Sequence, residues 1–140
     1  MPNTLSPRDQ INLLFDSLLY AANRTFMLEE TQRDPHHGSH QVNRRDLVDQ
    51  LRRHIPRNVQ VPPSHSTTDR ELYAEMLSLI RAWRTSINER VRDANKQDQQ
   101  SVADGVVTVM YELIEEENVI GCGDLCYDKE RGCVECPPQQ

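Results

Sequence analysis

All four cysteines of this 140-residue chain lie within its last twenty residues, at a spacing that suits metal binding. Cys122 and Cys126 form a C-x3-C pair. Cys133 and Cys136 follow after six residues as a C-x2-C pair. Two closely spaced thiolate pairs can supply the tetrahedral site that Zn²⁺ prefers. We therefore predict one structural zinc ion bound by these four residues.

The segment between the two cysteine pairs is shorter than in most zinc ribbons and fingers, so a compact knuckle is the form expected here. Gly121 and Gly123 allow the tight backbone that a first knuckle needs. Disulfides and free thiols are the two alternatives that the spacing leaves open. A thiol-exchange role is less favoured, because the C-x2-C pair lacks the βαβ context of such catalysts.

Arginines form a second group, since residues 43–57 carry five of them against Asp46 and Asp49. These arginines are Arg44, Arg45, Arg52, Arg53 and Arg57. A helix that presents guanidinium groups can bind a phosphate backbone, and duplex RNA is recognised largely by its shape and backbone. RNA binding is therefore the alternative function. The simpler interpretation is a solvated helix face, on which Asp49 pairs with Arg45 and Arg53 at i±4.

Other combinations of chemically active residues are weaker. His36, His37 and His40 lie in a polar segment with no defined fourth ligand nearby, so a solvated loop is favoured over a metal site. The sequence has no Gly-rich phosphate loop, no nucleophile elbow and no H-E-x-x-H motif. Four thiolates would also leave a zinc ion without an open position. We therefore predict that the protein is not an enzyme and has no small-molecule substrate.

The charge is distributed unevenly over the chain. The net charge is −6, and the residues from Asp98 onward carry ten acids and two bases, whereas the first 97 residues carry a balance of +2. This negative net charge argues against a protein that binds nucleic acid over its whole surface. Neither a signal peptide nor an apolar run of membrane-spanning length occurs in the sequence. We predict an intracellular protein, cytoplasmic or nuclear, with reduced cysteines as the default.

Hydrophobic periodicity indicates the elements that must position these residues. Residues 68–95 form the longest helix, about 40 Å at 1.5 Å per residue, and Thr68 with Glu71 is a capping-box signal at its start. Further helices are predicted over 7–30, 43–54 and 99–117, and the intervening segments are predicted loops, including a polar break at 96–100. Gly105 and the β-branched residues after it make a strand the minor alternative for the last helix.

The predicted fold is all-α: a bundle of three to four helices over residues 1–118, followed by a short Cys-rich tail over 119–140. The apolar stripe of helix 68–95 is longer than either helix 11–26 or helix 47–55 can cover, which predicts a homodimer or a larger assembly. The expected interface residues are Leu72, Met76, Ile80, Trp83 and Ile87.

These features together favour a non-enzymatic protein-interaction module that self-associates and docks a partner protein. Small, arginine-biased chains with a helical bundle and a cysteine tail occur among viral accessory proteins, which is an analogy of type only.

Overall fold

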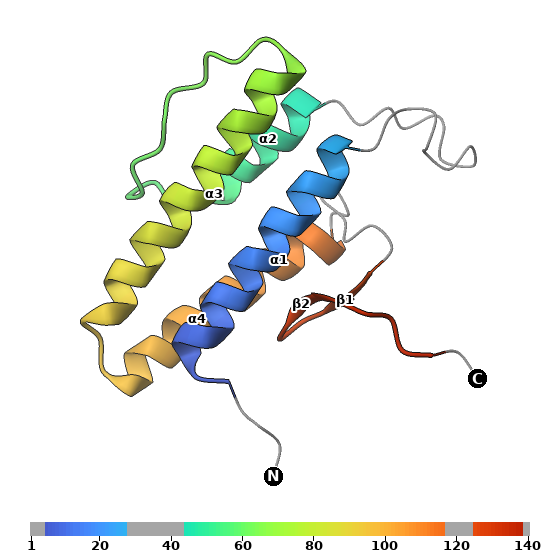
Figure 1. Cartoon of the computed structure of the whole chain (residues 1–140). Helices are drawn as coiled ribbons and strands as arrows, with labels where there is room; N and C mark the ends of the chain where they lie inside the picture. The colour runs from blue at the N-terminus through green and yellow to red at the C-terminus, as the bar shows by residue number, and fades with distance from the viewer. Residues whose placement is uncertain (1–4, 28–43, 117–124, 139–140) are drawn as a thin grey trace.

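A computed structural model of the chain describes residues 5–27, 44–116 and 125–138. Its described elements are four α-helices, one π-helical segment and a two-stranded hairpin (Figure 1). They are α1 (Pro7–Met27), α2 (Arg44–His54), α3 (Asp69–Arg92), α4 (Lys96–Tyr111), η3 (Glu112–Glu116), β1 (Cys126–Asp128) and β2 (Gly132–Val134). The predicted helical bundle is confirmed. No helix in the described part of the chain is both long enough and apolar enough to cross a membrane.

Side-chain caps begin three of the helices. Ser6 Oγ accepts a hydrogen bond from the Asp9 amide at 3.1 Å, as its place before Pro7 predicts. The capping box of α3 is formed as predicted, with the Thr68 hydroxyl and the Glu71 carboxylate each accepting a backbone N–H of the other residue at 3.2 Å.

The prediction for the last helix is wrong at its start. Asn95 accepts a hydrogen bond from the Asp98 amide at 2.8 Å, and this cap begins α4 at Lys96, inside the expected polar break. The strand alternative for residues 106–109 is also wrong, because those residues belong to α4.

The core lies where α1 packs against both α3 and α4. Phe15 of α1 meets Trp83 of α3 edge to face, with ring centroids 5.1 Å apart and planes at 88°. Beside this contact, Arg84 donates to the carboxylate of Asp16 at 2.8 Å and to the side-chain oxygen of Asn12 at 3.0 Å. These polar contacts fix the register of α1 on α3.

The apolar stripe of α3 is covered within a single chain by α1, α2 and α4. All five predicted interface residues are buried in this core: Leu72, Met76, Ile80, Trp83 and Ile87. The sequence predicts a homodimer because apolar surface would be left over on this stripe, and for these five residues that premise does not hold. Assembly itself stays a prediction.

The hairpin packs on α1, near the middle of that helix (Figure 1). Its strands pair antiparallel, with Tyr127 opposite Cys133. Ser17 Oγ donates to the carbonyl oxygen of Arg131 at 3.3 Å. Gly132 adopts a φ of 85°, and a Cβ at this position would overlap the side chain of Ser17. The described part of the cysteine tail is therefore anchored to the bundle through a close backbone approach.

Candidate functional site: a groove between α3 and α4

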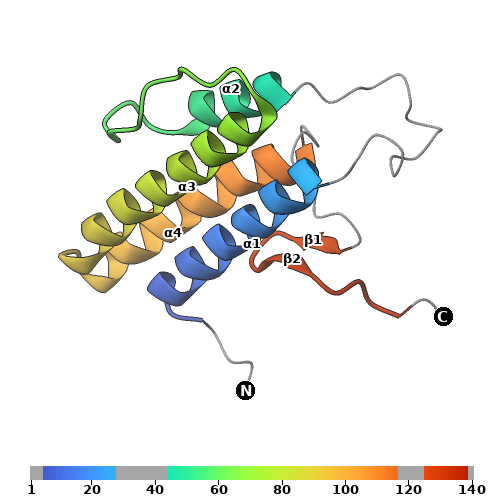
Figure 2. The same ribbon diagram turned by 45° about the horizontal axis from the view of Figure 1, so that its top comes forward.

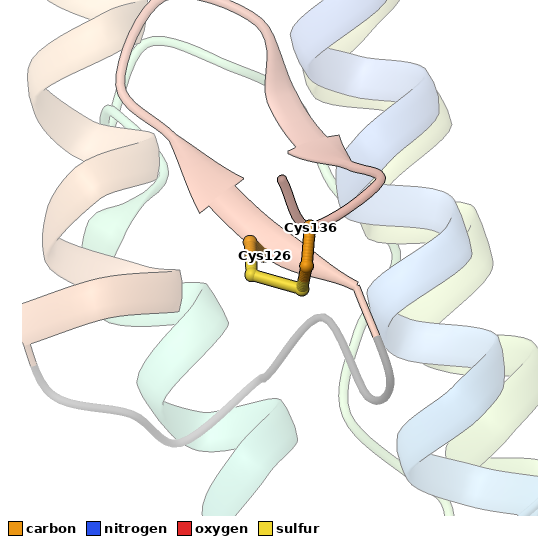
Figure 3. Close-up of a disulfide and its surroundings, with 2 residues drawn as sticks. All are labelled: Cys126 and Cys136. Atoms are coloured by element: carbon orange, nitrogen blue, oxygen red, sulfur yellow. A yellow bond between two sulfur atoms is a disulfide. The ribbon is translucent and has the colours of Figure 1, made fainter. Parts of the chain in front are cut away.

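The cysteines of the hairpin are in the oxidised form. Cys126 and Cys136 are joined by a disulfide, with their Cα atoms 4.9 Å apart (Figure 3). Cys133 is disulfide-bonded as well, and its sulfur lies 3.9 Å from the carbonyl oxygen of Ser17. The Cys126–Cys136 pair therefore forms a disulfide, which is one of the two alternatives to zinc binding that the cysteine spacing leaves open. Cys122 lies outside the described residues.

The zinc prediction concerns the reduced protein, because only thiolates bind the ion and disulfide sulfurs are not available to it. It therefore stays a prediction. Among the described residues, no cluster of three or more His, Cys, Asp or Glu side chains is arranged to hold a metal. The three histidines of the predicted loop 31–42 lie outside the described part of the chain.

Two of the five arginines in the basic segment neutralise a buried acid. The Glu75 side chain is only 4% exposed, and Arg52 Nε donates to its Oε2 atom at 3.0 Å. Arg45 Nη2 lies 3.7 Å from the same oxygen. Burial alone would raise the pKa of Glu75, but hydrogen bonds from Ser66 and Arg52 and the two arginine charges outweigh it. The pKa therefore lies below its ordinary value of 4.5.

The same arginines tie the segment before α3 to α2. Arg45 donates to the carbonyl oxygen of Ser66 at 3.1 Å, and Arg52 donates to that of Pro62 at 2.7 Å. Arg45 also pairs with Asp49 at 3.1 Å, which confirms one predicted i,i+4 ion pair. Arg45 and Arg52 are thus structural. Arg53 and Arg57 are exposed, and the side chain of Arg44 lies outside the described set.

The described residues form a groove of about 610 Å³ between α3 and α4. Its apolar lining consists of Trp83, Ile87, Ala94, Val102, Val106 and Val109. Polar groups come from Arg90 of α3, from Asp93 just after that helix, and from Asp98 and Ser101 of α4. Pro56 lines the groove just beyond the end of α2. Such a cavity is in the size range of pockets that bind ligands.

The length of α2 explains why this groove exists. Figures 1 and 2 both place α2 beside the N-terminal half of α3, and α2 ends at His54 while α3 continues to Arg92. Beyond Pro56, the facing surfaces of α3 and α4 therefore have no third helix of the described chain between them. Gly105 deepens the groove, since it is exposed and no atom lies within 4 Å of where its Cβ would be.

Trp83 connects the groove with the core. It lines the groove, and it also makes the edge-to-face contact with Phe15. It is 1% exposed, and its indole N–H has no hydrogen-bond acceptor among the residues that the structure describes. A buried donor without a partner costs on the order of 1–3 kcal/mol.

Of the five predicted interface residues, the structure brings only Trp83 and Ile87 to the groove. The opposite wall, on α4, was not predicted as a site. Its signal in the sequence was Gly105, an isolated glycine in a helical pattern, which often has a packing or functional reason.

No protein-family model, no curated protein and no solved structure matches this chain.

Proposed function

We propose that the chain is a non-enzymatic protein-interaction module that docks a partner protein in the groove between α3 and α4. The observation that carries this proposal is the apolar lining, to which α3 contributes the buried Trp83 and Ile87 and α4 the partly exposed Val102 and Val109. An apolar groove between two helices is a recurring receptor for a helical segment of another protein.

The chemistry of the lining supports binding rather than catalysis. Ser101 is the hydroxyl in the groove, and it donates to the carbonyl oxygen of Gln97 at 3.2 Å. The groove lining holds no histidine or cysteine that could act as a base or nucleophile beside it. The side chains that it does hold are suited to excluding water and pairing charge.

Site-specific cross-linking tests the proposal. A photo-cross-linking amino acid in place of Val102 should capture one partner protein from cells that contain the chain. Adding Gly105→Leu should abolish that product, because the new side chain fills the groove. Gln100→Leu, on an exposed position of α4 outside the groove lining, is the matched control and should leave the product intact.

The captured partner is then purified and titrated against the chain by calorimetry. Burial of apolar surface predicts a negative heat-capacity change on binding. Equal capture by the wild-type and Gly105→Leu proteins would refute docking in the groove.

We also propose that the chain self-associates as a homodimer or a larger assembly, as the sequence predicts. Light scattering at micromolar concentration tests it, and a monomer mass would refute it. Gly105→Leu should not change the mass unless the second copy uses the same groove.

RNA binding remains the alternative because Arg53 and Arg57 are exposed. A gel shift with a generic RNA duplex at two salt concentrations tests it, using the Arg53→Ala/Arg57→Ala protein as the comparison. Binding through phosphates weakens steeply with salt, with a log–log slope of about −0.7 to −0.9 per contact. Tight, salt-sensitive binding that this double change weakens would overturn the protein-docking proposal in favour of RNA.

A further inference from the structure

We propose that the Cys126–Cys136 disulfide is a redox-sensitive staple, that is, a cross-link that holds the hairpin in its folded shape. While it is closed, the hairpin stays docked on α1 and α4, and its reduction releases the hairpin from the bundle. This device is separate from the groove between α3 and α4, so it does not depend on the proposed function.

Along α1, the bundle contacts the backbone of the hairpin turn. Gln10 Nε2 donates to the carbonyl oxygen of Glu130 at 3.4 Å, and Ser17 Oγ donates to that of Arg131 at 3.3 Å. The next residue, Gly132, approaches Ser17 so closely that a Cβ would overlap its side chain. Because these contacts are made by backbone groups, the hairpin can dock on α1 only while its turn keeps this conformation.

On α4, the hairpin makes contact through two side chains that the same turn positions. The ring centroid of Tyr127 lies 6.1 Å from that of Tyr111, and the Lys129 ammonium group lies 5.6 Å from the Tyr111 centroid. Leu125, Tyr127 and Cys133 also pack against the core of the bundle. A hairpin that loses its shape would therefore lose its contacts with both helices.

The strands of the hairpin are too short to maintain this shape on their own. β1 and β2 pair over three residues each, and an isolated two-stranded hairpin is at best marginally stable in water. Asp128 Oδ1 accepts hydrogen bonds from the amides of Glu130 and Arg131 at 2.8 and 3.1 Å. These bonds shape the turn, but they do not hold the opposite end of the hairpin together.

The disulfide holds that opposite end. Cys126 is the first residue of β1 and Cys136 lies two residues beyond β2, so the bond encloses the whole hairpin in a loop with a sequence separation of 10 (Figure 3). Such a cross-link stabilises mainly by restricting the unfolded chain. Cys136 is exposed and Cys126 is partly exposed, so a reductant can reach the bond.

Opening the staple is a two-electron reduction that a dithiol can supply. A thiolate of the dithiol attacks one sulfur of the disulfide, and the S–S bond breaks as a mixed disulfide forms. The second thiolate of the dithiol then displaces the protein sulfur. The dithiol leaves as a disulfide, and its two protons end on the thiols of Cys126 and Cys136.

Amide hydrogen exchange of the full chain in its oxidised and reduced states tests the proposal. The dithiol is used together with a metal chelator, so that no metal ion can take the place of the disulfide. Exchange in residues 126–134 should become about 10–100-fold faster on reduction, the factor expected when a cross-link over a loop of about ten residues is lost. Exchange in α3 and α4 should not change.

Nuclear magnetic resonance shows whether the hairpin also leaves the bundle. The amide signals of Ser17 and Tyr111, which both contact the hairpin, should shift on reduction. The signal of Trp83 should stay in place, because its contact with Phe15 lies in the core between α1 and α3.

Two variants assign the effect to this disulfide, because Cys133 is disulfide-bonded as well and a reductant opens its bond too. Cys126→Ser/Cys136→Ser should show the fast exchange without any reductant. Glu135→Gln is the matched control, since it changes an exposed position of the same loop and keeps both cysteines. It should respond to the reductant as the wild-type protein does.

Unchanged exchange in the hairpin of the reduced protein would overturn the proposal. So would slow exchange in Cys126→Ser/Cys136→Ser, which would assign the hold on the hairpin to the bond of Cys133. Fast exchange with unmoved signals of Ser17 and Tyr111 would mean that the hairpin loosens while it stays docked. Equal acceleration in α3 and α4 would mean that the bundle itself unfolds, and either of these results would contradict release of the hairpin alone.

Discussion

The two sides of the α3–α4 pair are built differently. On one side α1 packs against both helices, and the edge-to-face contact of Phe15 with Trp83 is reinforced by the ion pair of Arg84 with Asp16. On the other side α2 covers only the first part of α3, and a groove follows between Trp83 and Val102. The same two helices thus present one closed surface and one open surface.

This difference separates stability from binding. Side chains on the α1 side are buried and fill space that nothing else can fill. On the groove wall of α4, Val106 is buried but Val102 and Val109 are only partly buried, so truncating either of these two removes little that holds the fold together. Substitutions on the two sides should therefore affect different measurements.

Phe15→Ala should have the largest effect. It removes a fully buried ring and leaves a cavity against Trp83, so the free energy of unfolding should fall by about 3–5 kcal/mol. Urea denaturation followed by circular dichroism measures this change.

Val102→Ala on the groove wall is the control for Phe15→Ala. Because Val102 is only half-buried, it should cost less than about 1 kcal/mol, while weakening the docking of a partner protein in the groove. Comparable losses of stability at the two sites would show that the groove wall is as essential to the fold as the α1 side.

Gly132→Ala should have the next largest effect, confined to the hairpin. Its φ of 85° disfavours any side chain, and a Cβ would overlap Ser17, so the cost should be about 1–3 kcal/mol. Amide hydrogen exchange should show faster exchange in residues 126–134, with little change in α3 and α4.

Replacing Ser17 with Gly in the same protein tests the cause. It removes the overlap but not the backbone strain, so hairpin protection should be recovered in part. Full protection in Gly132→Ala alone would contradict the close approach of the hairpin to α1.

Acid should weaken the attachment of α2 to α3 through Glu75. Burial opposes its ionisation, but hydrogen bonds from Ser66 and Arg52 and the arginine charges prevail, so its folded-state pKa lies below 4.5. The carboxylate form therefore contributes stability above the unfolded-state pKa. That contribution is lost as the pH falls through the folded-state value.

Thermal unfolding between pH 7 and pH 3 measures this contribution. Glu75→Gln should be less stable at pH 7, and its midpoint should fall less steeply below pH 4.5. Parallel pH profiles for the two proteins would show that another group controls acid unfolding.

The helices could be predicted well because the apolar residues that pack in the core recur at intervals of three and four along the sequence. The stripe of α3 and the caps at Ser6 and Thr68 could be recognised from residues three and four apart. The start of α4 was missed because Asn95 is followed by a polar first turn, in which no apolar residue marks the helix.

Tertiary features were much less accessible. Glu75 lies on the apolar stripe of α3, and a single acid there could have indicated a buried partner among the nearby arginines. The groove depends on where α2 ends relative to α3, which no local pattern records. The hairpin was missed because its three-residue strands are too short for an alternating pattern.

The smallest effect on the bundle is expected from metal binding by the tail. In the reduced protein, Cys122, Cys126, Cys133 and Cys136 should bind one zinc ion per chain. Metal analysis after purification with a reductant measures this, and oxidation should release the ion because the Cys126–Cys136 disulfide withdraws two of the four ligands.

Zinc binding and release by the tail should hardly change the stability of the helical bundle. Its core is formed by α1, α2, α3 and α4. The hairpin packs on α1 and also contacts Tyr111 of α4 through Tyr127 and Lys129. Cys133→Ser should therefore abolish zinc binding in the reduced protein while changing the unfolding midpoint of the helices only slightly, since partly exposed positions rarely alter stability by more than about 0.5 kcal/mol. Four titratable thiols without zinc would remove the metal site. A large loss of helix stability in Cys133→Ser would instead show that the hairpin stabilises the bundle, as Phe15 does.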